Sequence, residues 1–286
     1  MLVIVLGLLI RAAVGRALAP LEQVRAEIGQ RGVTSLHELD AGGMPDEVAP
    51  LVMALNDLLL RLDQAMMAQR RFIADAAHEL RSPLTAVKLQ AQIASRANSE
   101  SDRRLALAQL SGGVDRASHL IEQLLDMARL EPSARRATFA PVALDALIKQ
   151  VIANFSPQAD ARGIDLGVGA CEPLTLASQA ESLRMLLGNL VDNAVRYTPD
   201  GGRIDVELRC IDGHAVISVS DSGPGIPESE HEQVFERFYR LAGSEIPGSG
   251  LGLAIVRQAA QSLGGRVELG NSMAGGLAVR VILPLR

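Results

Sequence analysis

The sequence predicts a multidomain protein in which an all-helical part is followed by a two-layer α/β domain. From about residue 48 to residue 128, apolar residues recur at alternating steps of three and four, the spacing of helices packed in bundles. From about residue 138 the pattern changes. Apolar and polar residues then alternate over 204–208 and 215–219, as in half-buried strands.

The first ten residues are apolar, interrupted only by Gly7, and arginines follow at positions 11, 16 and 25. Ten helical residues span about 15 Å, roughly half of a bilayer core. We interpret residues 1–14 as a truncated transmembrane helix, with the arginine-rich flank and everything from about residue 11 onward in the cytoplasm. A short buried helix and an error at the gene start are the alternatives.

Residues 15–65 predict two helical stretches around a glycine-containing connector, with an apolar heptad pattern in the second stretch. At the end of this segment the spacing changes, because the steps from Ala65 through Gln69 and Ile73 to Ala77 are four residues each. Such a stutter locally unwinds a coiled coil. Our hypothesis is that this junction passes a rotation or a change of register to the helix that follows.

Residues 66–133 predict an antiparallel helical hairpin with its turn in the polar stretch Ser95–Arg104. Each helix carries one apolar row at heptad spacing, and we call these rows the seams. The first seam comprises Ile73, Ala77, Leu80, Leu84, Val87, Ala91 and Ala94, and the second comprises Leu107, Leu110, Val114, Ala117, Ile121, Leu124 and Ala128. Because one hairpin cannot bury both seams, we expect two copies to form a dimeric four-helix bundle.

His78 lies one residue past a seam position, so it flanks the buried stripe, with the carboxylate of Glu79 beside it. Pro83, four residues after Glu79, removes a backbone hydrogen bond and weakens the helix there. A single helical histidine is most often an ordinary surface residue. Its interpretation therefore depends on the chemistry of the second half of the chain.

In the α/β domain, residues 183–195 and 251–263 are predicted helices and 277–283 a closing strand. Asn189 and Asn193 stand four residues apart in the first of these helices and therefore share one face of it. Amide oxygens of this kind suit Mg²⁺. Arg196 can add positive charge for phosphate, and Tyr197 offers a flat face for a base.

Two glycine-containing segments follow. Asp221 is succeeded by Gly223 and Gly225, and its acceptor-only carboxylate suits an exocyclic amine such as that of adenine, although an ordinary turn is an equal alternative. Before the second segment, the aromatic cluster Phe235-Glu-Arg-Phe-Tyr-Arg240 offers Arg237 or Arg240 to a phosphate. The second segment itself opens a helix, where backbone amides form an anion site. Its members are Gly248, Ser249, Gly250, Leu251 and Gly252.

Several classes of site are excluded. The two lysines, Lys88 and Lys149, do not follow glycine, so there is no Walker P-loop, and the glycine spacing does not match a dinucleotide fingerprint. The cysteines Cys171 and Cys210 form neither a metal-type spacing nor a disulfide framework. A net charge of −5 without a basic tract argues against nucleic acid as a partner.

Taken in order, His-Glu-Leu-Arg-Ser-Pro, the asparagine segment, Asp-x-Gly-x-Gly, the Phe-Tyr cluster and Gly-Ser-Gly-Leu-Gly-Leu resemble the sensor histidine kinases of bacterial two-component systems. The residues of these motifs resemble those of the EnvZ-type group, and within it of kinases like QseC and PmrB. The resemblance implies a HAMP relay over 15–65, a dimerisation and phosphoacceptor domain over 66–133, and an ATP-binding domain of the GHKL (Bergerat) fold over 138–286.

The same resemblance implies residue roles. His78 matches the phosphorylated histidine, Glu79 its acid/base neighbour, Asn193 the magnesium ligand with Asn189 beside it, and Asp221 the adenine-binding carboxylate. The cofactors would be ATP and Mg²⁺. The partners would be a second copy and the receiver domain of a response regulator, of OmpR type. The protein would be anchored in the bacterial inner membrane by its N-terminal helix.

Two departures qualify the resemblance. Ser82 stands where the family commonly has Thr or Asn, a position that aids dephosphorylation of the regulator, and its hydroxyl could still orient a water. The family's first membrane helix and sensing domain have no counterpart in the sequence, so the stimulus is not visible. A GHKL-fold ATPase clamp without kinase activity and a catalytically inactive dimeric adaptor are the rival interpretations.

Overall fold

The computed structural model describes residues 1–11, 49–97, 99–130, 139–241, 246 and 248–285. Most of the predicted relay, 15–48, lies outside these residues. The chain divides into two compact units, Met1–Asp75 and Ala76–Arg286. In the first unit, residues 2–11 are helical and exposed. Within the described part of the chain, no helix has the length and apolar character needed to span a bilayer.

Helix α2, Ala49–Arg96, is one continuous helix of 48 residues. It runs through the predicted stutter and contains Pro83 in its interior without ending there. The missing amide of Pro83 leaves the carbonyl of Glu79 without its usual helical partner. Two residues after Pro83, the Thr85 hydroxyl donates to the carbonyl of Arg81 at 2.8 Å.

The turn of the hairpin is shorter than the predicted stretch Ser95–Arg104, since α2 ends at Arg96 and α3, Glu100–Arg129, begins four residues later. Ser99 caps α3, where its side chain accepts a hydrogen bond from the amide of Asp102 at 3.0 Å. Two acidic residues in the first turn complement the positive helix end. These local signals extend the helix into residues that composition alone assigned to a loop.

Within one chain, the buried residues of α3 coincide with the predicted seam only at Ala117. The buried residues are Ala106, Gly113, Ala117, Leu120, Gln123 and Met127. The seam residues Leu107, Val114 and Ile121 remain 44–50% exposed. The hairpin helices come close at Gly113, where an added Cβ would lie 2.9 Å from Cγ2 of Val87. One chain therefore leaves most of the predicted seam of α3 without cover.

The α/β domain has the predicted two layers. The five-stranded sheet has the order β2-β4-β5-β7-β6, with β2 parallel to β4 and the other pairs antiparallel. Its strands are β2 (Asp165–Cys171), β4 (Arg203–Ile211), β5 (His214–Asp221), β6 (Arg266–Asn271) and β7 (Leu277–Pro284). A small second sheet pairs β1 (Ala140–Ala143) with β3 (Thr175–Ser178).

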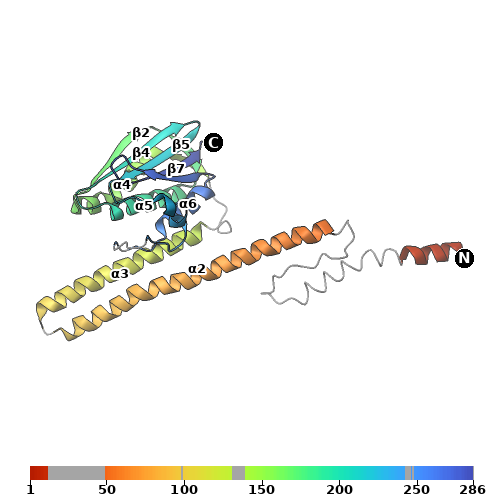
Figure 1. Ribbon diagram of the computed structural model, residues 1–286, viewed down its shortest axis with the longest axis horizontal. Helices are drawn as coiled ribbons and strands as arrows, with labels where there is room; N and C mark the ends of the chain where they lie inside the picture. Colours follow the sequence, from red (N-terminus) through yellow and green to blue (C-terminus); the bar gives the residue numbers. More distant parts are fainter. Residues whose placement is uncertain (12–48, 98, 131–138, 242–245, 247, 286) are drawn as a thin grey trace. The chain divides into compact units, whose positions relative to one another are not determined.

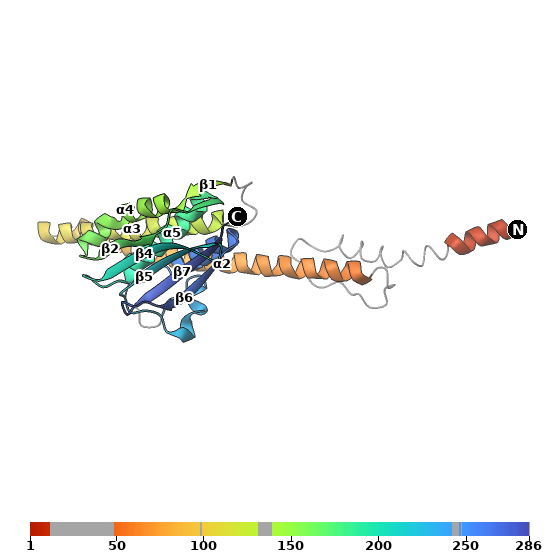
Figure 2. The ribbon, with the colours of Figure 1, turned by 90° about the horizontal axis from the view of Figure 1, so that it is seen from above.

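Three helices cover one face of the five-stranded sheet (Figures 1 and 2): α4 (Leu144–Ala161), α5 (Ala180–Tyr197) and α6 (Gly252–Ser262). The core lies between the layers. Strand β4 turns Ile204, Val206 and Leu208 toward it, all fully buried, which is the alternation that the sequence predicts. Short 3₁₀ turns at Glu228–Glu230 and Gln233–Phe235 lead from β5 toward α6.

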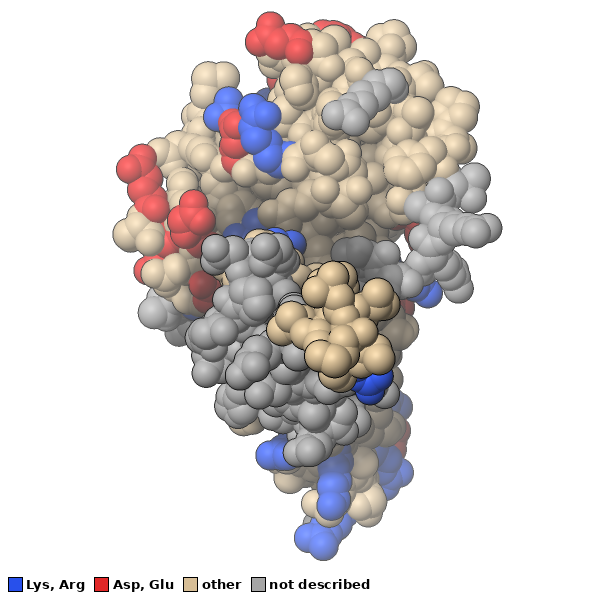
Figure 3. All heavy atoms as spheres, turned by 90° about the vertical axis from the view of Figure 1, so that its right-hand side faces the viewer, with Lys and Arg blue, Asp and Glu red and all other residues tan. Residues whose placement is uncertain are grey.

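The charged surface is mixed. On the face drawn in Figure 3, acidic and basic side chains of the described residues stand in small groups among uncharged ones. This distribution agrees with the small net charge of the chain.

Candidate functional site

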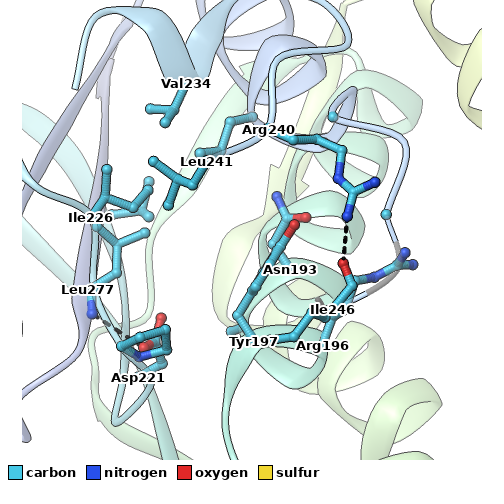
Figure 4. A pocket seen from close by; sticks show the side chains of 18 of the residues that line it. Asn193, Arg196, Tyr197, Asp221, Ile226, Val234, Arg240, Leu241, Ile246 and Leu277 are labelled. Carbon is cyan, nitrogen blue, oxygen red and sulfur yellow. Dashed lines mark hydrogen bonds between the residues drawn. The ribbon is translucent and has the colours of Figure 1, made fainter. Parts of the chain in front are cut away.

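A pocket of about 670 Å³ opens between the carboxyl-terminal half of α5, the end of β5 and the segment that leads into α6. Figure 4 shows its two walls: Asn193, Arg196 and Tyr197 of α5 stand on one side, and Asp221 and Leu277 on the other. The pocket combines apolar walls with a few polar groups, which is typical of a small-molecule site.

Of the thirteen residues predicted to bind ATP, the structure brings nine to the wall of this pocket. They are Asn193, Arg196, Tyr197, Asp221, Gly225, Gly248, Ser249, Gly250 and Gly252. They come from segments separated by up to about 60 residues of chain, so the fold collects what the sequence offers separately.

Asp221 lies at the end of β5 with 6% of its surface exposed. Its Oδ1 accepts hydrogen bonds from the amides of Gly223 at 2.8 Å and Leu277 at 3.1 Å. Burial raises the pKa of the Asp221 carboxyl above its ordinary value, and the two backbone hydrogen bonds offset part of that rise. Because Oδ1 is occupied twice, Oδ2 is the oxygen available for a ligand.

Glycine is required at Gly276, in the turn before β7, because a Cβ there would overlap the Asp221 carboxylate and the Gly223 amide. Close approach of this turn is what allows the Leu277 amide to reach Asp221. The same logic applies at Gly252, where a Cβ would lie 2.5 Å from the Asn193 amide. Asn193 therefore faces the start of α6 at close range.

Arg196 lies on α5 one turn after Asp192, and its Nη2 donates to Oδ2 of Asp192 at 2.9 Å. Burial alone would raise the pKa of Asp192, but the hydrogen bond from His119 and the positive charge of Arg196 outweigh burial, and the pKa is lowered. Asp192 thus stays ionised and holds Arg196 at the pocket wall.

Four predicted ATP-binding residues are not on the wall. Asn189 shares a helix face with Asn193, as predicted, but it is 8% exposed and donates to the carbonyl of Met185 at 2.9 Å. Leu251 is fully buried in the core. Arg237 lies 3.4 Å from the Gln258 amide oxygen, and Gly223 contributes its amide to Asp221.

Further polar groups line the pocket. Of the two arginines that the sequence offers for phosphate, Arg240 lines it and Arg237 does not, and Nη2 of Arg240 donates to the carbonyl of Ile246 at 3.0 Å (Figure 4). The hydroxyl of Tyr239 donates to the carboxylate of Glu230. The aromatic cluster gave a signal for this segment, but its spacing could not tell which arginine faces inward.

Gln123 of α3 also lines the pocket and was not predicted. The Ser249 hydroxyl donates to its Oε1 at 2.6 Å. These residues are 126 positions apart, and no sequence pattern links them.

The three residues predicted to carry out the chemistry lie together on α2. His78 and Ser82 are exposed and Glu79 is half-buried. His78 is therefore accessible on the surface of α2 in the single chain.

Family models match three consecutive parts of the chain. They are the PhoQ-like HAMP domain at residues 18–64, the His Kinase A (phospho-acceptor) domain at 68–133, and the histidine kinase-, DNA gyrase B- and HSP90-like ATPase at 178–286. The chain belongs to the bacterial sensor histidine kinases. The GHKL-type α/β sandwich and the helical phosphoacceptor region that the sequence predicts are thereby confirmed.

Individual proteins agree with this assignment. The chain is 40% identical to the sensor protein kinase PmrB of Pseudomonas aeruginosa over 98% of its own length and 59% of that protein. It is 39% identical to the sensor protein QseC of Escherichia coli K12, over 98% of its length and 61% of that protein. The chain thus spans about three-fifths of these curated relatives.

Among solved structures, full-length ShkA in complex with AMPPNP superposes with a TM-score of 0.53 at 27% identity. This match covers 75% of the present chain and 45% of ShkA.

Proposed function

We propose that this chain is the kinase part of a sensor that moves the γ-phosphoryl group of ATP to His78 and then to an aspartate on the receiver domain of a response regulator. The observation that carries the proposal is the pocket, in which Asn193, Asp221 and the glycine segment 248–252 converge on one space. An exposed histidine with a neighbouring carboxylate, His78 and Glu79, lies on a helix of the same chain.

ATP fits the polarity of the pocket. Oδ2 of Asp221 would accept a hydrogen bond from the exocyclic amine of adenine, which lies among the apolar side chains of the same wall. Arg196 and Arg240 supply positive charge near the phosphates, and the amides of the glycine segment lie at the start of α6. The bound AMPPNP of ShkA, an ATP analogue, supports the same use here.

A magnesium ion fits the donor set, because Asn193 offers an amide oxygen beside the glycine segment and Mg²⁺ otherwise draws its ligands from phosphates and water. When bound, the ion would neutralise charge on the triphosphate. Asn189 is less suited, since it is buried and does not line the pocket, and the hydrogen bond from its side-chain nitrogen to the carbonyl of Met185 fixes its orientation.

The chemistry at His78 balances with the residues present. The unprotonated ring nitrogen of a neutral imidazole attacks the γ-phosphorus, the bond to the β,γ-bridging oxygen breaks, and ADP leaves with that electron pair. The carboxylate of Glu79 accepts the proton from the other ring nitrogen. The phosphohistidine then passes the group to the regulator's aspartate. Ser82, one turn after His78, would orient a water molecule that hydrolyses the phosphoaspartate of the regulator and releases inorganic phosphate.

We extend the proposal to the whole assembly. Residues 1–14 would belong to a membrane helix, 15–65 to the relay, 66–133 to the dimerisation domain and 138–286 to the catalytic domain. The protein would act as a homodimer at the bacterial inner membrane, with residues from about 11 onward in the cytoplasm and an OmpR-type regulator as partner. The HAMP-type match and the names of the sensor relatives support this arrangement.

The test is incubation of the full chain with γ-labelled ATP and Mg²⁺, followed by denaturing electrophoresis. A kinase gives a protein-bound label that is labile in acid and stable in base, the behaviour of a phosphoramidate. A clamp-type ATPase gives free phosphate and an unlabelled chain, and that outcome would replace the kinase assignment with its rival.

A further inference from the structure

Two polar contacts join α3 to the wall of the ATP pocket. Nε2 of His119 lies 3.1 Å from Nη2 of Arg196 and 3.4 Å from Oδ2 of Asp192. One turn further along α3, the Ser249 hydroxyl donates to Oε1 of Gln123 at 2.6 Å. Because His119 and Gln123 are four residues apart, both stand on the helix face that meets the catalytic domain.

These contacts are enclosed rather than superficial. Gln123 is 5% exposed and Asp192 is 9% exposed, while His119 is partly covered. Nε2 of His119 either accepts a hydrogen bond from Arg196 or donates one to Asp192, depending on the tautomer of the ring. The proposed transfer chemistry uses His78, Glu79 and Ser82, and neither His119 nor Gln123 has a part in it.

Both contacts occupy hydrogen-bond donors that line the pocket proposed for the triphosphate. The Ser249 hydroxyl has a single proton, and Gln123 takes it, so this hydroxyl cannot donate to a phosphate until the contact with Gln123 breaks. Nη2 of Arg196 is directed at Asp192 and His119, so turning it fully toward a phosphate removes its bond to His119. ATP and α3 therefore compete for the same two donors.

The surroundings favour a contact that can open. Asp126, one turn beyond Glu122 on α3, is partly buried near Glu181 at the start of α5. Burial, together with the negative charges of Glu181 and Glu122, raises the pKa of the Asp126 carboxyl, against the lowering effect of Arg129 and His119. The negative charges of Asp126 and Glu181 across the same boundary therefore oppose docking, while the contacts of His119 and Gln123 favour it.

We propose that His119 and Gln123 form a latch, which holds the catalytic domain against α3 when no nucleotide is bound. Binding of the triphosphate of ATP releases this latch. The proposal rests on the proposed ATP site. Because the two binding events exclude each other, each weakens the other by the same factor. Binding of ATP would thus free the catalytic domain to approach a phosphoacceptor histidine. Without nucleotide, the catalytic domain would remain in contact with α3.

The experiment measures the affinity of a fluorescent ATP analogue with Mg²⁺ for the full chain. His119→Phe and Gln123→Met keep the size of each side chain and remove its acceptor. Since each lost contact equals one ordinary hydrogen bond, we expect the analogue to bind about fivefold more tightly per substitution. The matched control is Ser118→Ala, an exposed hydroxyl on the same helix, which should leave the affinity unchanged.

Affinity that is unchanged or weaker in both variants would overturn the latch, because Gln123 would then assist the nucleotide or ignore it. Hydrogen exchange on the unmodified chain gives a second readout that needs no substitution. Amides of residues 119–127 should lose protection when the analogue binds, and equal or greater protection would also overturn the latch. Failure of the unmodified chain to bind the analogue at all would instead contradict the proposed ATP site.

Discussion

The catalytic domain and the helical hairpin differ in how much of their apolar surface one chain can bury. Helix α5 alone buries eleven of its residues, and β4 presents three fully buried side chains to them. Helix α2 buries one residue, Val52, over 48 positions, and the α3 seam stays open. The catalytic domain thus has its core within one chain, whereas the hairpin leaves its apolar rows exposed, as the proposed dimer would require.

This difference separates two kinds of functional residue. Those of the ATP pocket are held by a finished core, so substitutions there should affect nucleotide chemistry and leave assembly alone. Those of the hairpin lie on a helix whose apolar surface one copy leaves exposed. Substitutions there should therefore affect dimerisation and function together.

The largest effect is expected at Asn193. Asn193→Asp replaces an amide by a negative charge beside the triphosphate, and labelling from γ-labelled ATP should fall by roughly 100-fold or more, the loss of a transition-state contact of several kcal/mol. The dimer, measured by light scattering, should persist. Asn189→Ala is the matched control, since its amide bonds within its own helix, and most of the labelling should remain. Equal losses in both variants would mean that the two asparagines act as a pair.

A second substitution tests the hairpin rather than the catalytic domain. Ile121→Glu places a charge in the exposed seam of α3, and burying it between two copies would cost several kcal/mol. The dimer should dissociate at least about tenfold more readily, while the catalytic domain still binds the ATP analogue. Leu105→Glu, also exposed on α3 but outside the predicted seam, is the control. A dimer that tolerates Ile121→Glu would place the interface elsewhere.

The third prediction concerns acid. Because the pKa of Asp221 is raised, its carboxyl takes up a proton at a higher pH than an ordinary aspartate, whose pKa is near 3.8. The proton adds to Oδ2, since Oδ1 accepts two amides, and the acceptor for adenine is lost. Affinity for the ATP analogue is therefore full when Asp221 is ionised and declines as the pH falls through that raised pKa.

Titration of the analogue between pH 7.5 and 4.5 measures this decline. Asp221→Asn cannot ionise and serves as the reference, in which binding is weak and the pH dependence of this group is absent. Parallel profiles in the two proteins would show that another group controls the acid response.

The smallest effect is expected at Ser82. Ser82→Ala removes a hydroxyl one turn from His78, and dephosphorylation of the regulator should slow by several-fold while labelling of the kinase continues. Thr85→Ala is a matched control, because the Thr85 hydroxyl is also exposed on α2 but bonds to the carbonyl of Arg81. An unaltered dephosphorylation rate would remove Ser82 from the reaction.

The same two regions show how far sequence reasoning reaches. Alternation predicted β4 and β5, and helical periodicity predicted α5 and α6, because those elements bury one regular face. Strand β2 was not predicted, since its residues are mostly exposed or half-buried and include Gly167 and Gly169. The hairpin turn was drawn too long because polar composition concealed the capping signal at Ser99.

Among the site residues, the motifs correctly identified Asn193, Asp221 and the glycine segment, which line one pocket. Local spacing could not tell which of their neighbours also face the pocket. Asn189 has the same spacing, but its side-chain nitrogen donates to the carbonyl of Met185 within its own helix. Arg240, not Arg237, reaches the wall. Gln123 and His119 were missed altogether, because contacts between distant segments depend on how the domains pack rather than on any local pattern.

The central claim is that a phosphoryl group from the pocket reaches His78. Its most direct test compares γ-phosphate labelling of the unmodified chain, His78→Gln and His214→Gln, the last being a histidine at the far end of β5 whose ring bonds to the carbonyl of Asp212. We expect label on the unmodified chain and on His214→Gln, and none on His78→Gln. Label that persists on His78→Gln would contradict the account.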